Sequence, residues 1–291
     1  MWMCRARTSP TPTATEVNDP PPRGAAVAVT RIDVELVARG LAPSRSAAQR
    51  LIADGAVLFG PGARVTRPSQ QVSEADALWV TESDETRYVS RGGAKLAHAL
   101  HAAGINPAGK VALDLGMSTG GFADCLLQAG AARVIGIEVG HGQLHPSLAA
   151  DPRVSCLERT HLLDVTLDGL AAQIVDTPSA GFVLAVADLS FISLARVLPC
   201  IDALLAEQST ALLLVKPQFE VGPGGLDRRG IVRDPKAAEA ALARIVAACQ
   251  ALGWSVIGTH ASALVGGDGN QETFIHARVG SRPTPLIEAT P

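Results

Sequence analysis

The sequence lacks the features that mark membrane-spanning, secreted and metal-binding proteins. No apolar run reaches the ~18 residues of a membrane-spanning helix, and the best candidate, residues 181–205, is broken by Asp188, Arg196 and Asp202. The N-terminus has no apolar stretch of the kind found in a signal peptide. The five cysteines are widely spaced, without a C-x-x-C pair or the Cys/His spacing of a zinc site. We therefore expect no membrane association, no metal and a reducing, cytoplasmic location.

Aromatic residues and net positive charge are also scarce. Aromatic residues make up 3% of the chain, so few rings are available to stack on bases. The net charge of −3 differs from the strongly basic balance that is typical of nucleic-acid-binding proteins. The charge is uneven, because residues 1–95 hold 12 Lys and Arg against 10 Asp and Glu, whereas the remainder holds 13 against 18. Any surface that binds a polyanion must therefore be local.

Composition divides the 291 residues into two folded regions and two tails. Residues 1–28 are rich in Thr, Pro and Ala, and we expect them, like residues 282–291, to be disordered. Residues 29–82 are predicted to form a small α+β domain. A charged linker, residues 83–90, then leads into a larger α/β domain at residues 91–281.

The small region is predicted to hold two short helices followed by a hairpin. Ile32 and Leu36 keep helical spacing up to Gly40, and Ser44 is suited to cap a second helix. Short apolar stretches on either side of a Gly-Pro-Gly turn indicate the hairpin. Arginines on these elements either contact phosphates or form an ordinary solvated face. The candidates are Arg31, Arg45, Arg50, Arg64 and Arg67, and Arg91 follows at the start of the larger region.

The larger region is organised around residues 111–122, which read V-A-L-D-L-G-M-S-T-G-G-F. An apolar strand, a carboxylate and a glycine-rich turn form the first β-turn-α unit of an open α/β sheet, where ligands bind beyond the carboxyl ends of the strands. The spacing differs from the dinucleotide fingerprint G-x-G-x-x-G, and the Lys-Ser/Thr of a phosphate-binding P-loop is missing. A compact ligand with an adenosine and a charged amino-acid tail fits this turn, which indicates S-adenosylmethionine. The alternative is a glycine turn that serves another ligand.

Charged residues end several later strands of the larger region. Glu138 ends the second strand, where α/β nucleotide sites hold ribose hydroxyls. Asp188 ends the fourth strand and Lys216 the fifth. Together with Lys95 and Glu272, which begin other elements, they are expected to face the carboxyl edge of the sheet. The segment Glu158-Arg159-Thr160-His161 follows the third strand and is expected to line the adenine end of the site.

Two lysines and two acids at one edge suit the methylation of a ribose 2′-hydroxyl. This reaction needs a base for a weakly acidic proton, and a lysine can serve if burial and a neighbouring positive charge lower its pKa. A nearby aspartate can orient that lysine, and a second lysine can hold phosphate; no metal is required. Leu-Ser-Phe follows Asp188 in place of the Pro-Pro-Tyr/Phe that is common in enzymes methylating base amino groups.

Residues 217–232 contain two prolines, four glycines, Arg228 and Arg229, and are predicted to form a mobile loop over the substrate. Asp234 and Pro235 then open a helix, as its N-cap and first residue.

Two sets of motifs resemble known families. The small region reads R-I-D-x-x-L-x-x-x-G-L-x-x-S-R-x-x-A-x-x-L-I-x-x-G-x-V, which resembles the S4 RNA-binding fold. The larger region contains Ser90-Arg-Gly-x-x-Lys95, Asp114-x-Gly-x-Ser-Thr-Gly-Gly-Phe122, Glu158-Arg-Thr160, Ala187-Asp-Leu-Ser-Phe-Ile-Ser-Leu194 and Val215-Lys-Pro-Gln-Phe-Glu-Val-Gly222. From about residue 30 to 280 the chain looks like the TlyA (hemolysin A) family, which joins an S4 domain to an FtsJ-like methyltransferase.

The resemblance implies an α/β, Rossmann-like class I methyltransferase fold preceded by a small α+β S4 domain. Its sheet would be seven-stranded and mostly parallel, with an antiparallel last strand. The implied activity is 2′-O-methylation of cytidine ribose in ribosomal RNA by S-adenosylmethionine, with ribosomal RNA or ribosomal subunits as partners. The family's catalytic tetrad falls on Lys95, Asp188, Lys216 and Glu272, with Lys216 as the base. The expected cofactor-binding residues are Asp114, Gly116, Ser118, Thr119, Gly120, Gly121, Phe122, Glu138, Glu158, Arg159, Thr160 and Asp188.

Two other functions stay open at this point. The same scaffold can methylate a small molecule, since the larger region is acidic and poor in aromatic residues. A non-enzymatic RNA-binding or hemolysin-like protein is the second. Met117, His141 and His161 depart from the family pattern, and they either alter cofactor affinity and substrate choice or simply pack and form ordinary hydrogen bonds.

Overall fold

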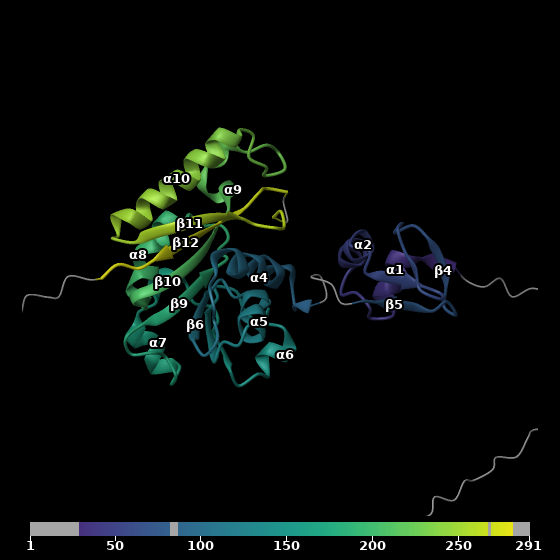
Figure 1. Cartoon of the computed structure of the whole chain (residues 1–291), viewed down its shortest axis with the longest axis horizontal. Coiled ribbons are helices and arrows are strands. Elements are labelled where there is room, and N and C mark those ends of the chain that lie inside the picture. Colours follow the sequence, from purple (N-terminus) through teal and green to yellow (C-terminus); the bar gives the residue numbers. More distant parts are fainter. Residues whose placement is uncertain (1–28, 82–86, 267–268, 282–291) are drawn as a thin grey trace, which may run out of the picture. The chain divides into compact units, whose positions relative to one another are not determined.

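The computed structural model describes residues 29–81, 87–266 and 269–281, which form two compact units divided between Val80 and Thr81 (Figure 1). The two predicted tails and residues 83–86 of the predicted linker lie outside the described residues. Residues 87–90 of that linker pack as part of the larger unit, because Tyr88 is buried in its core and the amide of Val89 donates to Asp124 at 2.8 Å.

The first unit holds two helices and two small sheets around one apolar core. Its elements are β1 (Val29–Arg31), α1 (Ile32–Ala38), α2 (Arg45–Ala53), β2 (Val57–Phe59), β3 (Ala63–Arg64), β4 (Gln71–Ser73) and β5 (Leu78–Val80). Helical spacing buries Ile32 and Leu36 on α1 against Leu51 on α2, as the sequence predicts. Ser44 caps α2, since its hydroxyl accepts a hydrogen bond from the amide of Ala47 at 3.2 Å.

The second unit is built on a seven-stranded sheet with the strand order β11-β12-β10-β9-β6-β7-β8. The strands are β6 (Val111–Leu115), β7 (Arg133–Ile137), β8 (Val154–Leu157), β9 (Phe182–Ala187), β10 (Leu205–Val215), β11 (Ser255–Ala261) and β12 (Thr273–Arg278). The last strand, β12, runs antiparallel to both of its neighbours, whereas the pairs among β6, β7, β8, β9 and β10 are parallel. The implied methyltransferase sheet is therefore confirmed.

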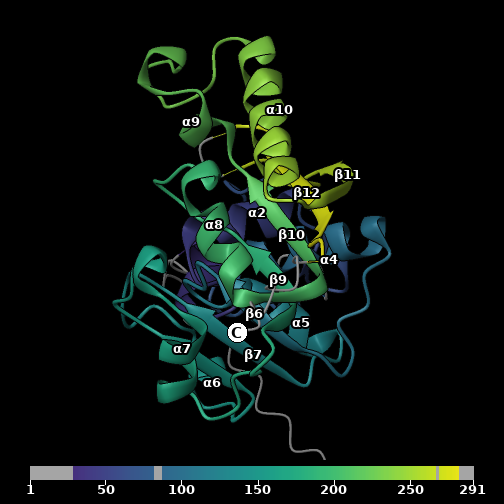
Figure 2. The same ribbon diagram turned by 90° about the vertical axis from the view of Figure 1, so that its left-hand side faces the viewer.

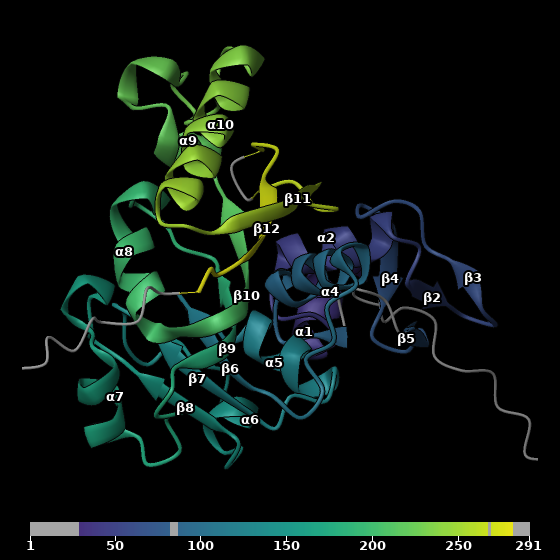
Figure 3. The same ribbon diagram turned by 60° about the vertical axis from the view of Figure 1, so that its left-hand side comes forward.

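Helices cover both faces of this sheet (Figure 2, Figure 3). The helical elements are α4 (Arg91–Ala103), α5 (Gly121–Gln128), α6 (Pro146–Ala149), η1 (Leu162–Asp164), α7 (Leu167–Gln173), α8 (Leu194–Leu204), α9 (Pro217–Glu220), η2 (Pro223–Gly225) and α10 (Pro235–Ala251). Successive residues of a strand point to opposite faces of the sheet and so enter two different cores. On β6, for example, Ala112 packs on the side of α4 and α5, whereas Leu113 packs on the side of α8 and α10. The loops at the carboxyl ends of the strands therefore lie between the two helical layers.

The apolar stretch at 181–205 is divided between β9 and α8. Across the described part of the chain, every helix is too short or too polar to span a bilayer.

Candidate active site

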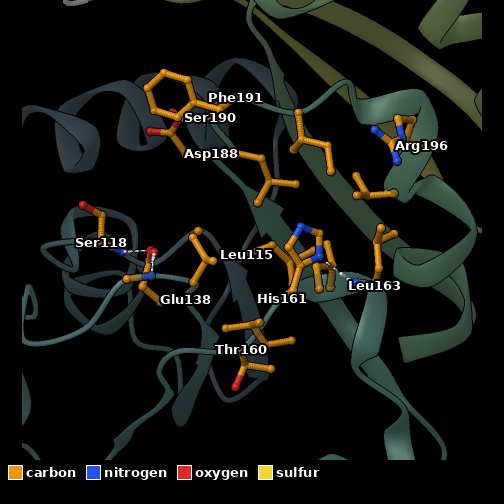
Figure 4. Close-up of a pocket in the computed structure, with 18 of the residues that line it drawn as sticks. Leu115, Ser118, Glu138, Thr160, His161, Leu163, Asp188, Ser190, Phe191 and Arg196 are labelled. Carbon is orange, nitrogen blue, oxygen red and sulfur yellow. Dashed lines mark hydrogen bonds between the residues drawn. The ribbon is translucent and has the colours of Figure 1, made fainter.

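A pocket of about 600 Å³ lies at the carboxyl ends of β6, β7 and β9 (Figure 4). This volume is in the range of pockets that bind small molecules and cofactors. The lining residues come from the turn after β6, the end of β7, the loop after β8 and the loop after β9. They are Leu115, Gly116, Ser118, Ile137, Glu138, Val139, Gly140, Gln143, Thr160, His161, Leu162, Leu163, Asp188, Leu189, Ser190, Phe191, Ile192, Arg196 and Val197.

The turn after β6 approaches the end of β9 closely. Gly116 has a φ of +83°, and a Cβ at this position would lie 2.8 Å from the carbonyl oxygen of Asp188. Because any other residue would clash with this backbone and adopt a strained conformation, the glycine is required by the geometry. The turn thereby brings the backbone of the first strand unit against Asp188 at the pocket.

Glu138 fixes the opposite side of the turn. One carboxylate oxygen accepts a hydrogen bond from the amide of Ser118 at 2.8 Å, and the other accepts from the amide of Gly140 at 2.7 Å. Figure 4 shows Ser118 and Glu138 side by side on one wall of the pocket. A carboxylate oxygen can accept a second hydrogen bond, so Glu138 keeps the capacity to bind hydroxyl groups of a ligand.

Asp114 is a fully buried carboxyl beneath this turn. Among the described residues, none donates a hydrogen bond of normal geometry to either of its oxygens. Burial, followed by the negative charges of Asp188 and Glu138, raises the pKa of Asp114 to about 8, and the nearby amide of Ala123 opposes that rise. A cationic ligand would relieve this crowding of acidic groups. The sulfonium and ammonium groups of S-adenosylmethionine fit such a site.

The four residues of the predicted tetrad form two ion pairs. Lys216 Nζ lies 2.7 Å from Asp188 Oδ1 and donates a hydrogen bond to Ser190 Oγ at 2.8 Å. Lys95 Nζ lies 2.5 Å from Glu272 Oε2, and both of these side chains are buried. Lys216 follows Val215 and Glu272 precedes Thr273, and these two neighbours form the last register pair of β10 and β12. Because each is ion-paired with one of the other two residues, all four groups lie at the carboxyl edge of the sheet.

Five of the predicted cofactor residues line the pocket: Gly116, Ser118, Glu138, Thr160 and Asp188. The others lie outside its lining, namely Asp114, Thr119, Gly120, Gly121, Phe122, Glu158 and Arg159. Phe122 is buried in the core, with its ring 6.1 Å from that of Phe274, and Gly120 and Gly121 begin α5. Glu158 accepts a hydrogen bond from the amide of Gly142 at 2.9 Å.

The loop after β9 contributes pocket residues beyond those that the sequence assigns to the site. Phe191 has a φ of +64° and is 91% exposed, with its ring 5.2 Å from that of Phe219. Leu189, Ile192 and Val197 supply an apolar wall, and Arg196 stands at the far side from Ser118 and Glu138 (Figure 4). The motif around Asp188 signals this loop, but not which of its side chains face the pocket.

Of the three departures from the family pattern, Met117 packs in the core. Its side chain is 2% exposed, and a Cβ on Gly136 would collide with the methionine methyl carbon. His161 lines the pocket, and its Nδ1 accepts a hydrogen bond from the amide of Leu163 at 3.3 Å. His141 is exposed and lies outside the pocket lining.

In the first unit, a buried carboxylate organises two of the predicted RNA-binding arginines. Asp33 accepts two hydrogen bonds from Arg31, both 2.9 Å long, one from Arg45 at 2.9 Å and one from Gln49 at 2.8 Å. The guanidinium of Arg31, helped by Gln49 and Arg45 and opposed by burial, holds the pKa of Asp33 well below its usual range. The side chain of Arg45 still remains 56% exposed.

The other predicted RNA-binding residues differ in their surroundings. Arg64 and Arg67 are exposed, and Arg50 is partly buried. Arg91 belongs to the second unit, where its guanidinium donates to the carbonyl of Val265 at 2.9 Å. Across the described residues, no cluster of three or more His, Cys, Asp and Glu side chains is suited to hold a metal ion.

Comparisons with known proteins agree with this architecture. Residues 88–279 match the FtsJ-like methyltransferase family, and residues 30–78 match the S4 domain. The chain is 44% identical over 248 residues to the 16S/23S rRNA (cytidine-2′-O)-methyltransferase TlyA of Mycobacterium tuberculosis, covering 85% of this chain and 89% of that protein. It is 35% identical over 246 residues to hemolysin A of Brachyspira hyodysenteriae, covering 84% and 98%.

A solved structure is also similar over nearly the whole chain. A Streptococcus thermophilus protein described as a candidate hemolysin superposes with a TM-score of 0.65 at 33% sequence identity, covering 91% of this chain and 93% of that protein. The chain therefore belongs to the TlyA (hemolysin A) family, in which an S4 domain is joined to an FtsJ-like, S-adenosylmethionine-dependent methyltransferase domain.

Proposed function

We propose that this protein transfers the methyl group of S-adenosylmethionine to the 2′-oxygen of cytidine ribose in ribosomal RNA. The observation that carries the proposal is the placement of Lys216, paired with Asp188, beside a cofactor-sized pocket at the carboxyl edge of the sheet. The name of the Mycobacterium tuberculosis relative supports the choice of substrate. A ribosomal substrate places the reaction in the cytoplasm.

The pocket provides groups suited to each part of the cofactor. The oxygens of Glu138 are suited to the ribose hydroxyls, and the segment from Thr160 to Leu163 offers polar and apolar contacts to the adenine. Asp114 and Asp188 supply negative charge for the sulfonium and ammonium groups. When bound, S-adenosylmethionine supplies a methyl group that leaves its sulfur for the 2′-oxygen.

Lys216 acts as the base in this proposal. In its neutral form, Nζ accepts the proton of the 2′-hydroxyl, so that the O–H bond breaks as the new oxygen–carbon bond forms. Asp188 at 2.7 Å and Ser190 at 2.8 Å hold Nζ in a fixed position. Lys95 and Glu272 complete the tetrad as a buried ion pair that links α4 to the residue preceding β12. Loss of either partner would leave the other charge buried and uncompensated.

Phe191 is suited to hold the target base. Its side chain is exposed and lines the same pocket. Phe191 also directly follows Ser190, the hydrogen-bond partner of Lys216. Aromatic rings of this kind stack on unpaired bases whatever their sequence.

Transfer of a labelled methyl group tests the proposed function. Ribosomal subunits from a strain lacking this protein are expected to accept label from S-adenosylmethionine, at a cytidine whose 3′ bond becomes resistant to alkaline hydrolysis. Subunits from the parent strain, which already carry the modification, serve as the control and should accept none. Failure to label, with cofactor binding intact, would instead indicate a small-molecule acceptor. Failure to bind the cofactor would favour a non-enzymatic role.

The arginines of the first unit should contribute to RNA affinity. Replacing Arg45 and Arg50 together by alanine is expected to weaken binding of a ribosomal RNA fragment by roughly tenfold for each phosphate that is no longer bound. The slope of log affinity against log salt should become shallower by about 1 to 2. The paired variant Arg153→Ala with Arg278→Ala removes the same charge from the amino edge of the parallel strands, opposite to the pocket. Equal binding by both double variants would contradict an RNA-binding role for Arg45 and Arg50.

A further inference from the structure

Exposed basic side chains gather on the segment between α9 and α10. We call residues 226–236 the basic turn; its four cationic residues, Arg228, Arg229, Arg233 and Lys236, are all exposed. Among the described residues, none of the four has a carboxylate oxygen within 4.0 Å of its charged group. This concentration of positive charge stands out because the chain from residue 96 onward holds 13 basic against 18 acidic residues.

The two carboxylates of the basic turn are engaged by its own backbone. Asp227 accepts hydrogen bonds from the amides of Arg229 at 2.8 Å and Ile231 at 2.9 Å. Asp234 caps α10 by accepting from the amide of Lys236 at 2.9 Å. Both carboxylates therefore shape the backbone. The charges of Arg229 and Arg233 act on Asp227 only at longer range, because neither forms an ion pair with it.

The basic turn is hydrogen-bonded within itself, although the sequence predicts a mobile loop here. Leu226 and Val232 form a β-bridge, and the amide of Asp227 donates to the carbonyl of Ile231 at 2.8 Å. The amide of Arg233 reaches back to the carbonyl of Gly225 at 3.1 Å. This closed turn presents Arg228 and Arg229 at its tip.

Asn270 links the basic turn to the segment that precedes β12. It is 3% exposed; its Oδ1 accepts from the amide of Val232 at 2.9 Å, and its Nδ2 donates to the carbonyl of Gly230 at 2.9 Å. Two residues further on, Glu272 forms the ion pair with Lys95. On its N-terminal side, α9 and η2 connect the basic turn to Lys216. The basic turn is therefore linked through the chain to Lys216 and through the hydrogen bonds of Asn270 to the segment that carries Glu272.

We propose that the basic turn binds backbone phosphates of the RNA strand next to the target nucleotide, and that Asn270 is the positioning residue that holds it there. This inference rests on the proposed function. Guanidinium groups match the geometry of phosphate oxygens and stay charged under all conditions. The contact would be independent of base sequence, and it would bring the strand toward Lys216 without touching the reacting atoms.

The test compares Arg228→Ala with Arg229→Ala, made together, against the control pair Arg153→Ala with Arg278→Ala. Each is titrated with a protein-free ribosomal RNA transcript and with intact ribosomal subunits. We expect the first pair to raise Kd for both about tenfold or more and to flatten the salt dependence by about 1 to 2. Cofactor Kd, and kcat at saturating substrate, should stay within about twofold. The control pair should bind like the unaltered protein.

Asn270→Ala separates positioning from charge. Alone, it should raise Kd for the transcript, whereas in the Arg228→Ala, Arg229→Ala background it should add little, because the groups that it positions are already gone. Additive effects would overturn the role assigned to Asn270.

Other outcomes separate this proposal from the proposed function. Unchanged Kd for both probes, in a protein that still methylates ribosomal RNA, would overturn the phosphate-binding role alone. Weaker binding seen only with subunits would overturn it in favour of a contact with a ribosomal protein. If the unaltered protein transfers no methyl group to ribosomal RNA while the basic turn still governs transcript binding, the proposed function fails and this inference survives as an RNA-binding surface.

Discussion

Lys216→Ala is expected to lower kcat for methyl transfer by about 10²- to 10⁴-fold, which is the usual contribution of a general base. The expected loss follows from the position of Nζ, held between Asp188 and Ser190 beside the cofactor pocket. Cofactor affinity should stay within about twofold, because Lys216 does not line that pocket. Single-turnover transfer to ribosomal subunits, with cofactor binding measured in parallel, checks both expectations.

Lys216→Arg distinguishes a base from a fixed positive charge. Arginine keeps the charge and can pair with Asp188, but it does not give up its proton and so cannot accept another. If Lys216 is the base, the arginine variant should be as inactive as the alanine variant. Lys110→Ala provides the matched control, since Lys110 is a lysine outside the site whose Nζ bonds only to the carbonyl of Asn106 among the described residues. Retention of more than a tenth of the activity by Lys216→Arg would assign the residue an electrostatic role instead.

Much of the fold could be predicted from apolar runs that end in charged or glycine residues. The strands predicted to end at Glu138 and Asp188 are found as β7 and β9, each ending one residue earlier. By contrast, the apolar run that ends at Lys216 begins at Ala211, whereas β10 begins six residues earlier, at Leu205. Residues 206–210 include polar side chains and a register shift against β9, so this part of the strand has no apolar pattern to detect. The three-residue strands β1 and β4 are too short to show alternation.

The sequence places the tetrad at one edge of the sheet but does not indicate its pairing. Lys95 and Glu272 are 177 residues apart, and only the folded sheet brings them into contact. Phe122 shows the converse limit. The family resemblance implies that it contacts the cofactor, whereas its ring on α5 is buried in the core, 6.1 Å from that of Phe274. The exposure of Phe191 could not be predicted either, because it depends on a backbone conformation with positive φ that neither composition nor periodicity indicates.

Asp114→Asn is expected to make the cofactor-free protein more stable at pH 8 and to weaken cofactor binding. Burial and the charges of Asp188 and Glu138 raise the pKa of Asp114 to about 8, so the folded protein keeps a proton that the unfolded chain releases near pH 4. Between these two pH values the folded state binds more protons, and its free energy of unfolding therefore falls as pH rises, by ~1.4 kcal/mol per pH unit. Asparagine resembles the protonated carboxyl and removes this dependence. Thermal unfolding from pH 5 to pH 9 should show the two proteins diverging toward high pH.

Cofactor binding should show the opposite pH dependence in the unaltered protein. A cation bound near Asp114 favours the ionised carboxylate, so binding releases a proton below about pH 8 and affinity rises toward that pH. Calorimetry in two buffers of different ionisation enthalpy measures this release directly, and Asp114→Asn should abolish it. Asp168→Asn is the matched control, because Asp168 is exposed on α7 outside the pocket lining. Cofactor binding without proton release, and with equal affinity in Asp114→Asn, would remove Asp114 from the cofactor site and leave its buried carboxyl a purely structural group.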